Sequence, residues 1–118
     1  FCEQVDAIER IEPLVQKSRE NLADLKIHNV KFKHGDGFID WSESIKYDGI
    51  LCAAAPRSYP EDLVSILKND AKLVIPVGGS NQVLKTIKKI NDNEIEENTY
   101  DDVSFVPMLP GISQGRMD

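Results

Sequence analysis

The alternation of apolar and polar positions near the start of the chain predicts a short strand that ends at Glu9-Arg10. A helix is predicted next, and Pro13 suits its first turn. The inward face of this helix should carry residues spaced four and three apart, namely Leu14, Ser18, Leu22 and Leu25. Val30 to His34 alternates again, and its outward lysines are typical of a strand at the edge of a sheet.

The middle of the chain carries two uninterrupted apolar runs, the pattern of parallel strands that helices cover on both faces. Tyr47 to Ala55 is predicted to be the central strand, and Lys72 to Val77 the next buried strand. Between them a helix should begin at Pro60, with acidic residues favourably placed near its positive end. Its predicted inward residues are Leu63, Val64 and Leu67.

The segment Gln82 to Ile90 fits two structures. Its apolar spacing suits a helix, whereas the turn at residues 91–93 and the later run Asp102 to Pro107 suit an antiparallel hairpin. We favour the hairpin. Alternation of strands and helices along the chain then predicts an α/β layer structure with right-handed crossovers.

Composition narrows the classes of partner. A chain of 118 residues suits one domain, and a net charge of -6 disfavours nucleic acid and anionic membranes. The apolar runs are far shorter than the roughly 20 residues that span a membrane. Cys2 and Cys52 lack a metal-type spacing and read as reduced thiols, so we expect a cytoplasmic protein. Because the chain opens with Phe1 directly before a strand, we expect a fragment of a longer protein.

Two carboxylates follow predicted strands, where open parallel sheets bind ligands. Glu9 can accept hydrogen bonds from vicinal ribose hydroxyls, or it can be a solvated acid or a partner of Arg10. Asp36 lies in a Gly-Asp-Gly turn that calls for positive φ; it can stabilise the turn alone, or accept a hydrogen bond from an exocyclic amine such as that of adenine.

Other polar residues carry no predicted chemistry. His28 and His34 lack a Ser or Cys at a spacing that suggests a triad, so we assign them no role and predict no catalytic side chain. Gly78-Gly79 could cradle phosphate, but without the other residues of a phosphate loop it reads as a plain turn.

Several short motifs occur in an order that resembles the protein-L-isoaspartate O-methyltransferase family, which belongs to the class I S-adenosylmethionine-dependent methyltransferases. They are AIERI (7–11), IHNV (27–30), HGDGF with Trp41 (34–41), YDGILCAAAP (47–56), LVIPVGG (73–79) and SFVPMLPG (104–111). Together they cover almost the whole chain. The resemblance implies a Rossmann-like methyltransferase sheet, mostly parallel with a C-terminal antiparallel hairpin, of which residues 1–118 form the C-terminal part of a single domain.

The resemblance also implies site residues and chemistry. Glu9, with Arg10 beside it, would hold the ribose of S-adenosylmethionine, and Asp36, with Gly35 and Gly37 shaping the loop, would contact adenine. Small residues would leave room for methyl transfer and for the damaged peptide: Ala53, Ala54, Ala55, Pro56, Val106 and Pro107. The implied reaction methylates the α-carboxylate of isoaspartyl peptides and proteins and needs no metal.

The chain departs from the family pattern in several places. The family's glycine-rich strand and loop upstream of Glu9 is absent, which implies two exposed sheet edges, self-association and no activity for the chain alone. Cys52 stands where Thr or Gly is common, the segment 57–59 is one residue longer than usual, and residues 69–71 replace a Pro-Gly-Gly turn.

Three hypotheses follow. The first is the C-terminal portion of a protein-repair methyltransferase. The second is a non-catalytic remnant that acts through protein contacts, and the third is a methyltransferase of the same fold with another acceptor.

Overall fold

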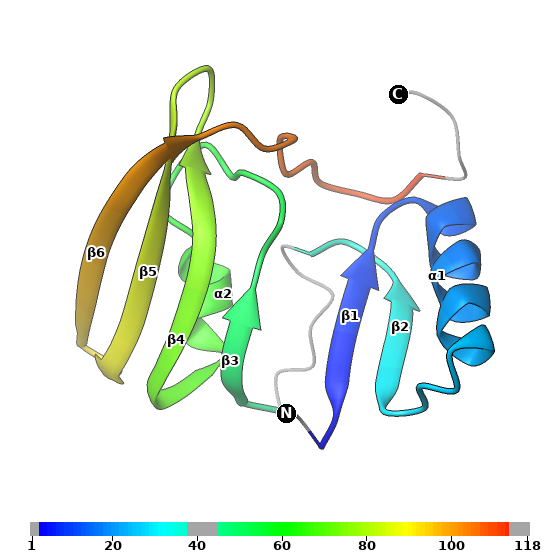
Figure 1. The fold of residues 1–118 in the computed structure, drawn as a ribbon. Coiled ribbons are helices and arrows are strands. Elements are labelled where there is room, and N and C mark those ends of the chain that lie inside the picture. The colour runs from blue at the N-terminus through cyan, green and yellow to red at the C-terminus, as the bar shows by residue number, and fades with distance from the viewer. Residues whose placement is uncertain (1–2, 38–44, 114–118) are drawn as a thin grey trace. The chain divides into compact units, whose positions relative to one another are not determined.

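A computed structural model describes residues 3–37 and 45–113 of the chain. These residues form two compact units, one from residues 3–37 and 110–113 and the other from residues 45–109. The elements in chain order are β1 (Val5–Glu9), α1 (Glu12–Asp24), β2 (Val30–His34), β3 (Tyr47–Leu51), α2 (Glu61–Ser65), β4 (Leu67–Gly78), β5 (Gln82–Asn91) and β6 (Glu94–Val103). Figure 1 labels all of them.

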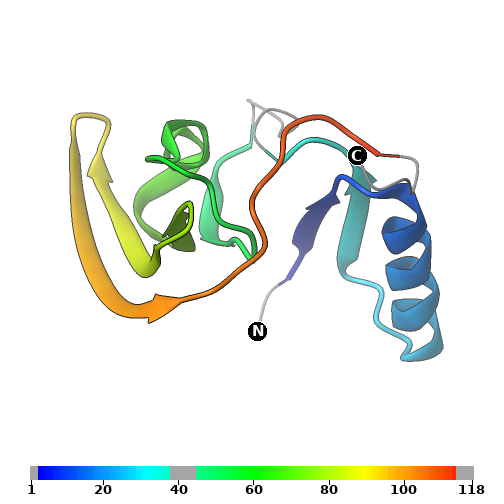
Figure 2. The same ribbon diagram turned by 90° about the horizontal axis from the view of Figure 1, so that it is seen from above.

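The first unit is a strand, helix, strand arrangement. β1 and β2 pair in parallel with a register that runs from Val5 beside Val30 to Glu9 beside His34. The crossover helix α1 lies alongside this pair in both views (Figures 1 and 2). The predicted strands and helix are therefore confirmed, including a proline, Pro13, in the first turn of α1.

The predicted inward face of α1 was right at Ser18 and Leu22 and wrong at Leu14 and Leu25. Leu14 is 44% exposed, whereas Val15 is 1% exposed and is the buried residue of the helix. Ser18 and Leu22 are half-buried and lie three and seven positions beyond Val15, so they continue its face. Leu25 lies at the end of the helix and is exposed.

The second unit is a four-stranded sheet in the order β3-β4-β5-β6. β3 pairs in parallel with β4, and the remaining neighbours pair antiparallel. Side chains at alternate positions of β4 and the facing Ile87 of β5 form the core with α2, which covers one face of the sheet (Figure 2). Leu73 and Ile87 are direct partners across the ladder, and both are fully buried. The mixed α/β sheet agrees with the prediction.

Three local predictions in this unit were wrong. The run from Tyr47 is a strand only to Leu51, and among the described strands it lies at an edge of its sheet, with Leu51 84% exposed. Leu67 is buried as predicted, but it opens β4 instead of ending α2. The predicted turn at residues 69–71 lies inside β4, where Asp70 has a φ of 67° and the register with β3 shifts.

The hairpin predicted in place of a helix is confirmed. β5 and β6 pair antiparallel around the turn between Asn91 and Glu94. β6 itself spans residues 94–103, earlier in the chain than the predicted run 102–107. It carries five acidic residues and no basic one, and almost all of it is exposed.

No helix of the described part of the chain is long and apolar enough to cross a membrane.

Candidate functional site

The two candidate carboxylates follow strands that are neighbours in one unit. Glu9 is the last residue of β1 and lies opposite His34, the last residue of β2. The ladder continues for one more bond, because the Gly35 amide donates to the Glu9 carbonyl at 3.0 Å. Asp36 comes directly afterwards. The chain thus brings Glu9 and Asp36 to the same end of a parallel pair, where such sheets bind ligands.

Glu9 is held by the backbone that follows it. Its Oε2 accepts a hydrogen bond from the Arg10 amide at 2.7 Å and a longer one from the Ile11 amide at 3.4 Å. Its other oxygen, Oε1, makes no hydrogen bond to any described residue. One oxygen therefore fixes the side chain at the start of α1, and the other is available to a ligand.

Asp36 is buried, with 6% of its surface exposed. Its Oδ2 accepts a hydrogen bond from the Gly111 amide at 2.7 Å. Gly111 adopts a φ of 77°, a conformation that favours glycine. Gly35 is also buried and Gly37 half-buried. Among the described residues the glycines with positive φ are Gly78 and Gly111, so the positive φ predicted for the turn at 35–37 was wrong.

Arg10 carries a polar atom without a partner. Its Nε is buried and makes no hydrogen bond to any described residue. A buried donor left unpaired is costly, so water or a ligand oxygen is the partner that this position calls for. This end of the unit thus offers one acceptor, the Glu9 carboxylate oxygen, and one unpaired donor, the Arg10 Nε, which together fit a polar ligand with hydroxyl groups.

The predicted substrate residues lie together in the second unit. The Ala55 amide donates to the Val106 carbonyl at 2.8 Å, and the Met108 amide donates to the Ala55 carbonyl at 2.9 Å. Ala55 also forms an isolated parallel bridge with Pro107. Ala55 and Pro56 are buried, Ala54 is half-buried, and Ala53, Val106 and Pro107 are exposed. The two segments predicted from separate motifs are therefore neighbours in space.

Cys52 packs beside these segments. Its Sγ lies 3.3 Å from the Ala54 carbonyl, to which it donates, and 3.8 Å from the Met108 Sδ. Burial is the main influence on the Cys52 thiol, and it raises the pKa of this group. Because the nucleophilic form of cysteine is the thiolate, a raised pKa suits a packing residue.

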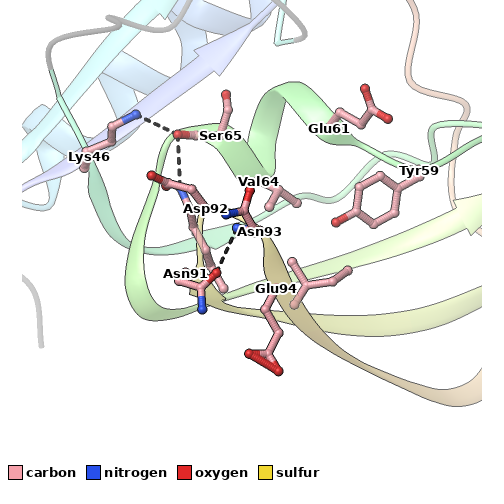
Figure 3. A pocket seen from close by; sticks show the side chains of 11 residues that line it. Lys46, Tyr59, Glu61, Val64, Ser65, Asn91, Asp92, Asn93 and Glu94 are labelled. Atoms are coloured by element: carbon pink, nitrogen blue, oxygen red, sulfur yellow. Dashed lines mark hydrogen bonds and ion pairs between the residues drawn. The ribbon is translucent and has the colours of Figure 1, made fainter.

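A cavity of about 390 Å³ lies elsewhere in the second unit (Figure 3). It lies where β3 and β4 begin and β5 turns into β6, opposite the carboxyl ends of the parallel strands. Lys46 donates to the Ser65 carbonyl at 2.7 Å, and Lys89 lies 3.5 Å from the same carbonyl, which ends α2. The two lysines thus serve as hydrogen-bond partners for a carbonyl at the C-terminal end of α2. We therefore interpret this cavity as a structural feature of the helix end and not as a ligand site.

Two further observations concern the chemistry of the chain. Burial, and then the charges of Glu97 and Glu61, raise the pKa of Tyr59, which borders this cavity. In the described ranges 3–37 and 45–113, no cluster of His, Cys, Asp and Glu side chains could hold a metal ion.

Comparison with known proteins identifies the family. The family model for protein-L-isoaspartate(D-aspartate) O-methyltransferase matches residues 2–112. The chain belongs to this family. The protein-L-isoaspartate O-methyltransferase of Saccharophagus degradans is 41% identical over 95% of the chain, and that of Hahella chejuensis is 43% identical over 92%. The chain spans about half the length of these relatives, 51% and 52% respectively.

Solved structures agree with the family. A protein-L-isoaspartate O-methyltransferase of Plasmodium falciparum, solved in complex with S-adenosyl-L-homocysteine, superposes with a TM-score of 0.78 at 33% identity. The match covers 90% of this chain and 52% of that one. A second structure, named protein-L-isoaspartate O-methyltransferase, has a TM-score of 0.81 at 23% identity and supports the fold. The predicted family and fold are thus confirmed.

Two long-range contacts near the candidate carboxylates could not be predicted from the local sequence pattern. Gly111 binds Asp36 from 75 positions away, and His34, to which we assigned no role, contacts Ser113 from 79 positions away. The one available signal was the motif SFVPMLPG, which ends at Gly111 and shares in the family resemblance.

Proposed function

We propose that this chain forms the carboxyl-terminal part of a protein-L-isoaspartate O-methyltransferase, which transfers a methyl group from S-adenosylmethionine to the α-carboxylate of isoaspartyl residues in damaged proteins. The observation that carries the proposal is the pair of carboxylates, Glu9 and Asp36, that follow two neighbouring parallel strands. Membership of the family supports the reaction, and relatives about twice as long support a longer active protein.

The first unit holds the nucleoside in this proposal. Glu9 accepts from the ribose hydroxyls through the oxygen that the backbone leaves available, and Asp36 accepts from the exocyclic amine of adenine. The buried Arg10 Nε supplies a donor that has no partner among the described residues. Gly35 and Gly37 keep the loop free of side chains around Asp36. Bound S-adenosylmethionine supplies an electrophilic methyl group on a sulfonium centre.

The second unit borders the acceptor. Alanines 53–55 and Pro56 leave room for a peptide, and the neighbouring Val106 and Pro107 offer an exposed apolar rim. An isoaspartyl carboxylate is already a nucleophile, so these residues act by positioning it and by excluding water, and no general acid or base is required.

We also propose that the 118-residue chain is inactive by itself and self-associates. β1 and β3 each have a strand partner on one side only among the described strands. An open strand edge pairs readily with another chain. For the whole protein, the partners are isoaspartyl peptides and proteins, without nucleic acid or membrane, and the location is the cytoplasm, where a free thiol such as that of Cys52 persists.

The test uses the full-length protein with Glu9→Gln and Asp36→Asn. Each substitution keeps size and removes a charge, so the affinity for S-adenosylhomocysteine measured by calorimetry should fall about 10- to 100-fold, the size expected for hydrogen bonds to a charged group. Glu20→Gln on exposed α1 is the control and should bind like the parent. Unchanged affinity in both site variants would rule out the assignment.

A methyl-ester assay tests the acceptor. An isoaspartyl peptide should be methylated and the matching aspartyl peptide should not. Equal labelling of both peptides would favour a methyltransferase with another acceptor, and no labelling by a protein that binds no S-adenosylhomocysteine would favour a non-catalytic remnant.

A further inference from the structure

The segment after Pro110 is bound to the end of β1. The Ser113 amide donates to the Arg10 carbonyl at 2.6 Å, and the Glu12 amide donates to the Ser113 carbonyl at 3.0 Å. Ile11 and Ser113 form a parallel bridge, and Ser113 is 2% exposed. In Figure 1 this red segment passes the tip of the β1 arrow. We call residues 110–113 the tail segment.

Two side chains from the end of β2 fasten the tail segment. Asp36 accepts from the Gly111 amide, as described above. The Nε2 of His34 lies 2.9 Å from the Arg10 carbonyl and 3.1 Å from the Ser113 carbonyl. Both partners can only accept, so Nε2 must carry the proton and donate to the two oxygens. His34 thereby joins the tail segment to the residue that follows Glu9.

The Arg10 peptide unit connects this bond to Glu9. The carbonyl of Arg10 accepts from His34, and its amide donates to the Glu9 Oε2 at 2.7 Å. On the other side, the tail segment donates directly to Asp36. One imidazole therefore acts on both carboxylates, on Glu9 through Arg10 and on Asp36 through the tail segment.

We propose that His34 is a positioning residue for the nucleoside site, which holds Glu9 and Asp36 in place by fastening Arg10 to the tail segment. This inference rests on the proposed function. His34 touches neither the cofactor nor the substrate in this role. Arg10 and Ser113 each keep a backbone hydrogen bond when the imidazole is removed, so loss of His34 should alter the site without unfolding the unit.

The experiment compares His34→Leu with His34→Gln in the full-length protein. Leucine cannot donate, whereas the glutamine amide can offer its N–H groups at a similar distance. The affinity for S-adenosylhomocysteine should fall about five- to tenfold in His34→Leu, as expected for a lost neutral hydrogen bond, and return to within about threefold of the parent in His34→Gln. His28→Leu, an exposed histidine without a hydrogen bond to the described residues, is the control.

A second readout follows the tail segment itself. Hydrogen exchange at the amides of Gly111 and Ser113 should be faster in His34→Leu than in the parent, with the urea midpoint unchanged. Combined with Asp36→Asn, His34→Leu should lower the affinity by less than the product of the two single effects, because both act through the tail segment.

Several outcomes would overturn the proposal: parent-like affinity in His34→Leu, a loss in His34→Gln as large as in His34→Leu, or a loss that follows a lowered urea midpoint. Failure of the proposed function is distinguishable from these. In that case Glu9→Gln and Asp36→Asn leave the affinity unchanged, or the parent binds no S-adenosylhomocysteine. Hydrogen exchange at the Gly111 and Ser113 amides is then the remaining test of the proposal. An unchanged exchange rate in His34→Leu would show that His34 does not fasten the tail segment.

Discussion

Glu9 and Asp36 follow neighbouring strands of one parallel pair, and each accepts a hydrogen bond from a backbone amide. Glu9 and Asp36 were predicted because carboxylates directly after strands can be seen in the local pattern, and the parallel pairing of β1 and β2 places both at one end. The roles of Gly111 and His34 depend on contacts made across 75 and 79 positions, which no local pattern reveals. The orphan Arg10 Nε likewise follows only from packing.

Gly78 gives a prediction at this scale. It has a φ of 138°, and a Cβ there would clash with the Asn81 carbonyl oxygen. Its amide also donates to the Pro56 carbonyl, at the proposed substrate rim. Gly78→Ala should therefore lower the free energy of unfolding by at least about 1–3 kcal/mol, measured by urea denaturation of the full-length protein.

Gly79→Ala is the matched control, because a Cβ at Gly79 meets nothing within 4 Å. Its stability should stay close to that of the parent. Equal losses in the two variants would contradict a steric origin at Gly78.

At the scale of elements, the sequence patterns predicted the type of most helices and strands. They were less accurate about the residues at which these elements begin and end. The types of β1 to β4 and of both helices followed from the apolar pattern, whereas the hairpin of β5 and β6 was favoured because of the turn at residues 91–93. The face of α1 was misjudged because Leu14 and Val15 are adjacent apolar residues, and sequence cannot say which one meets the sheet. α2 ends after five residues because Ile66 and Leu67 are buried on entering β4.

The end of α2 carries a second prediction. Lys89 is 7% exposed and donates to the Leu67 carbonyl at 3.1 Å, besides its contact with Ser65. Lys89→Met keeps the apolar stem but leaves the buried Leu67 carbonyl short of a donor, so the free energy of unfolding should fall by about 1–3 kcal/mol.

Lys88→Met is the control for urea denaturation of the full-length protein. Lys88 is the neighbouring residue of β5 and is half-buried, and its side chain makes no hydrogen bond to the described residues. A smaller loss in Lys89→Met than in Lys88→Met would contradict the role of Lys89 at the helix end.

At the scale of the whole molecule, the described strands pair in two sets, β1-β2 and β3-β4-β5-β6. The sequence predicted β3 as a central strand because its run is apolar throughout, and this inference fails since β3 pairs on one side only among the described strands. The apolar pattern of a strand indicates that its two faces can be buried. Which elements cover those faces, and which strands pair with it, depends on other parts of the protein.

The open edges give a prediction for the 118-residue chain. In sedimentation velocity it should form oligomers, because β1 and β3 can pair with other copies. Leu51→Lys adds a charge to the exposed edge strand β3 and should reduce association, whereas Ile95→Lys on the already charged β6 should not. A monodisperse monomer that melts cooperatively would contradict the prediction.

The acidic strand β6 limits how such oligomers can grow. Two copies that met along this strand would bring like charges together, and dilute buffer leaves that repulsion largely unscreened. Growth through the four-stranded sheet would then be confined to its β3 margin. Concentrated electrolyte would remove the barrier, and storage of the chain at low ionic strength follows as the practical choice.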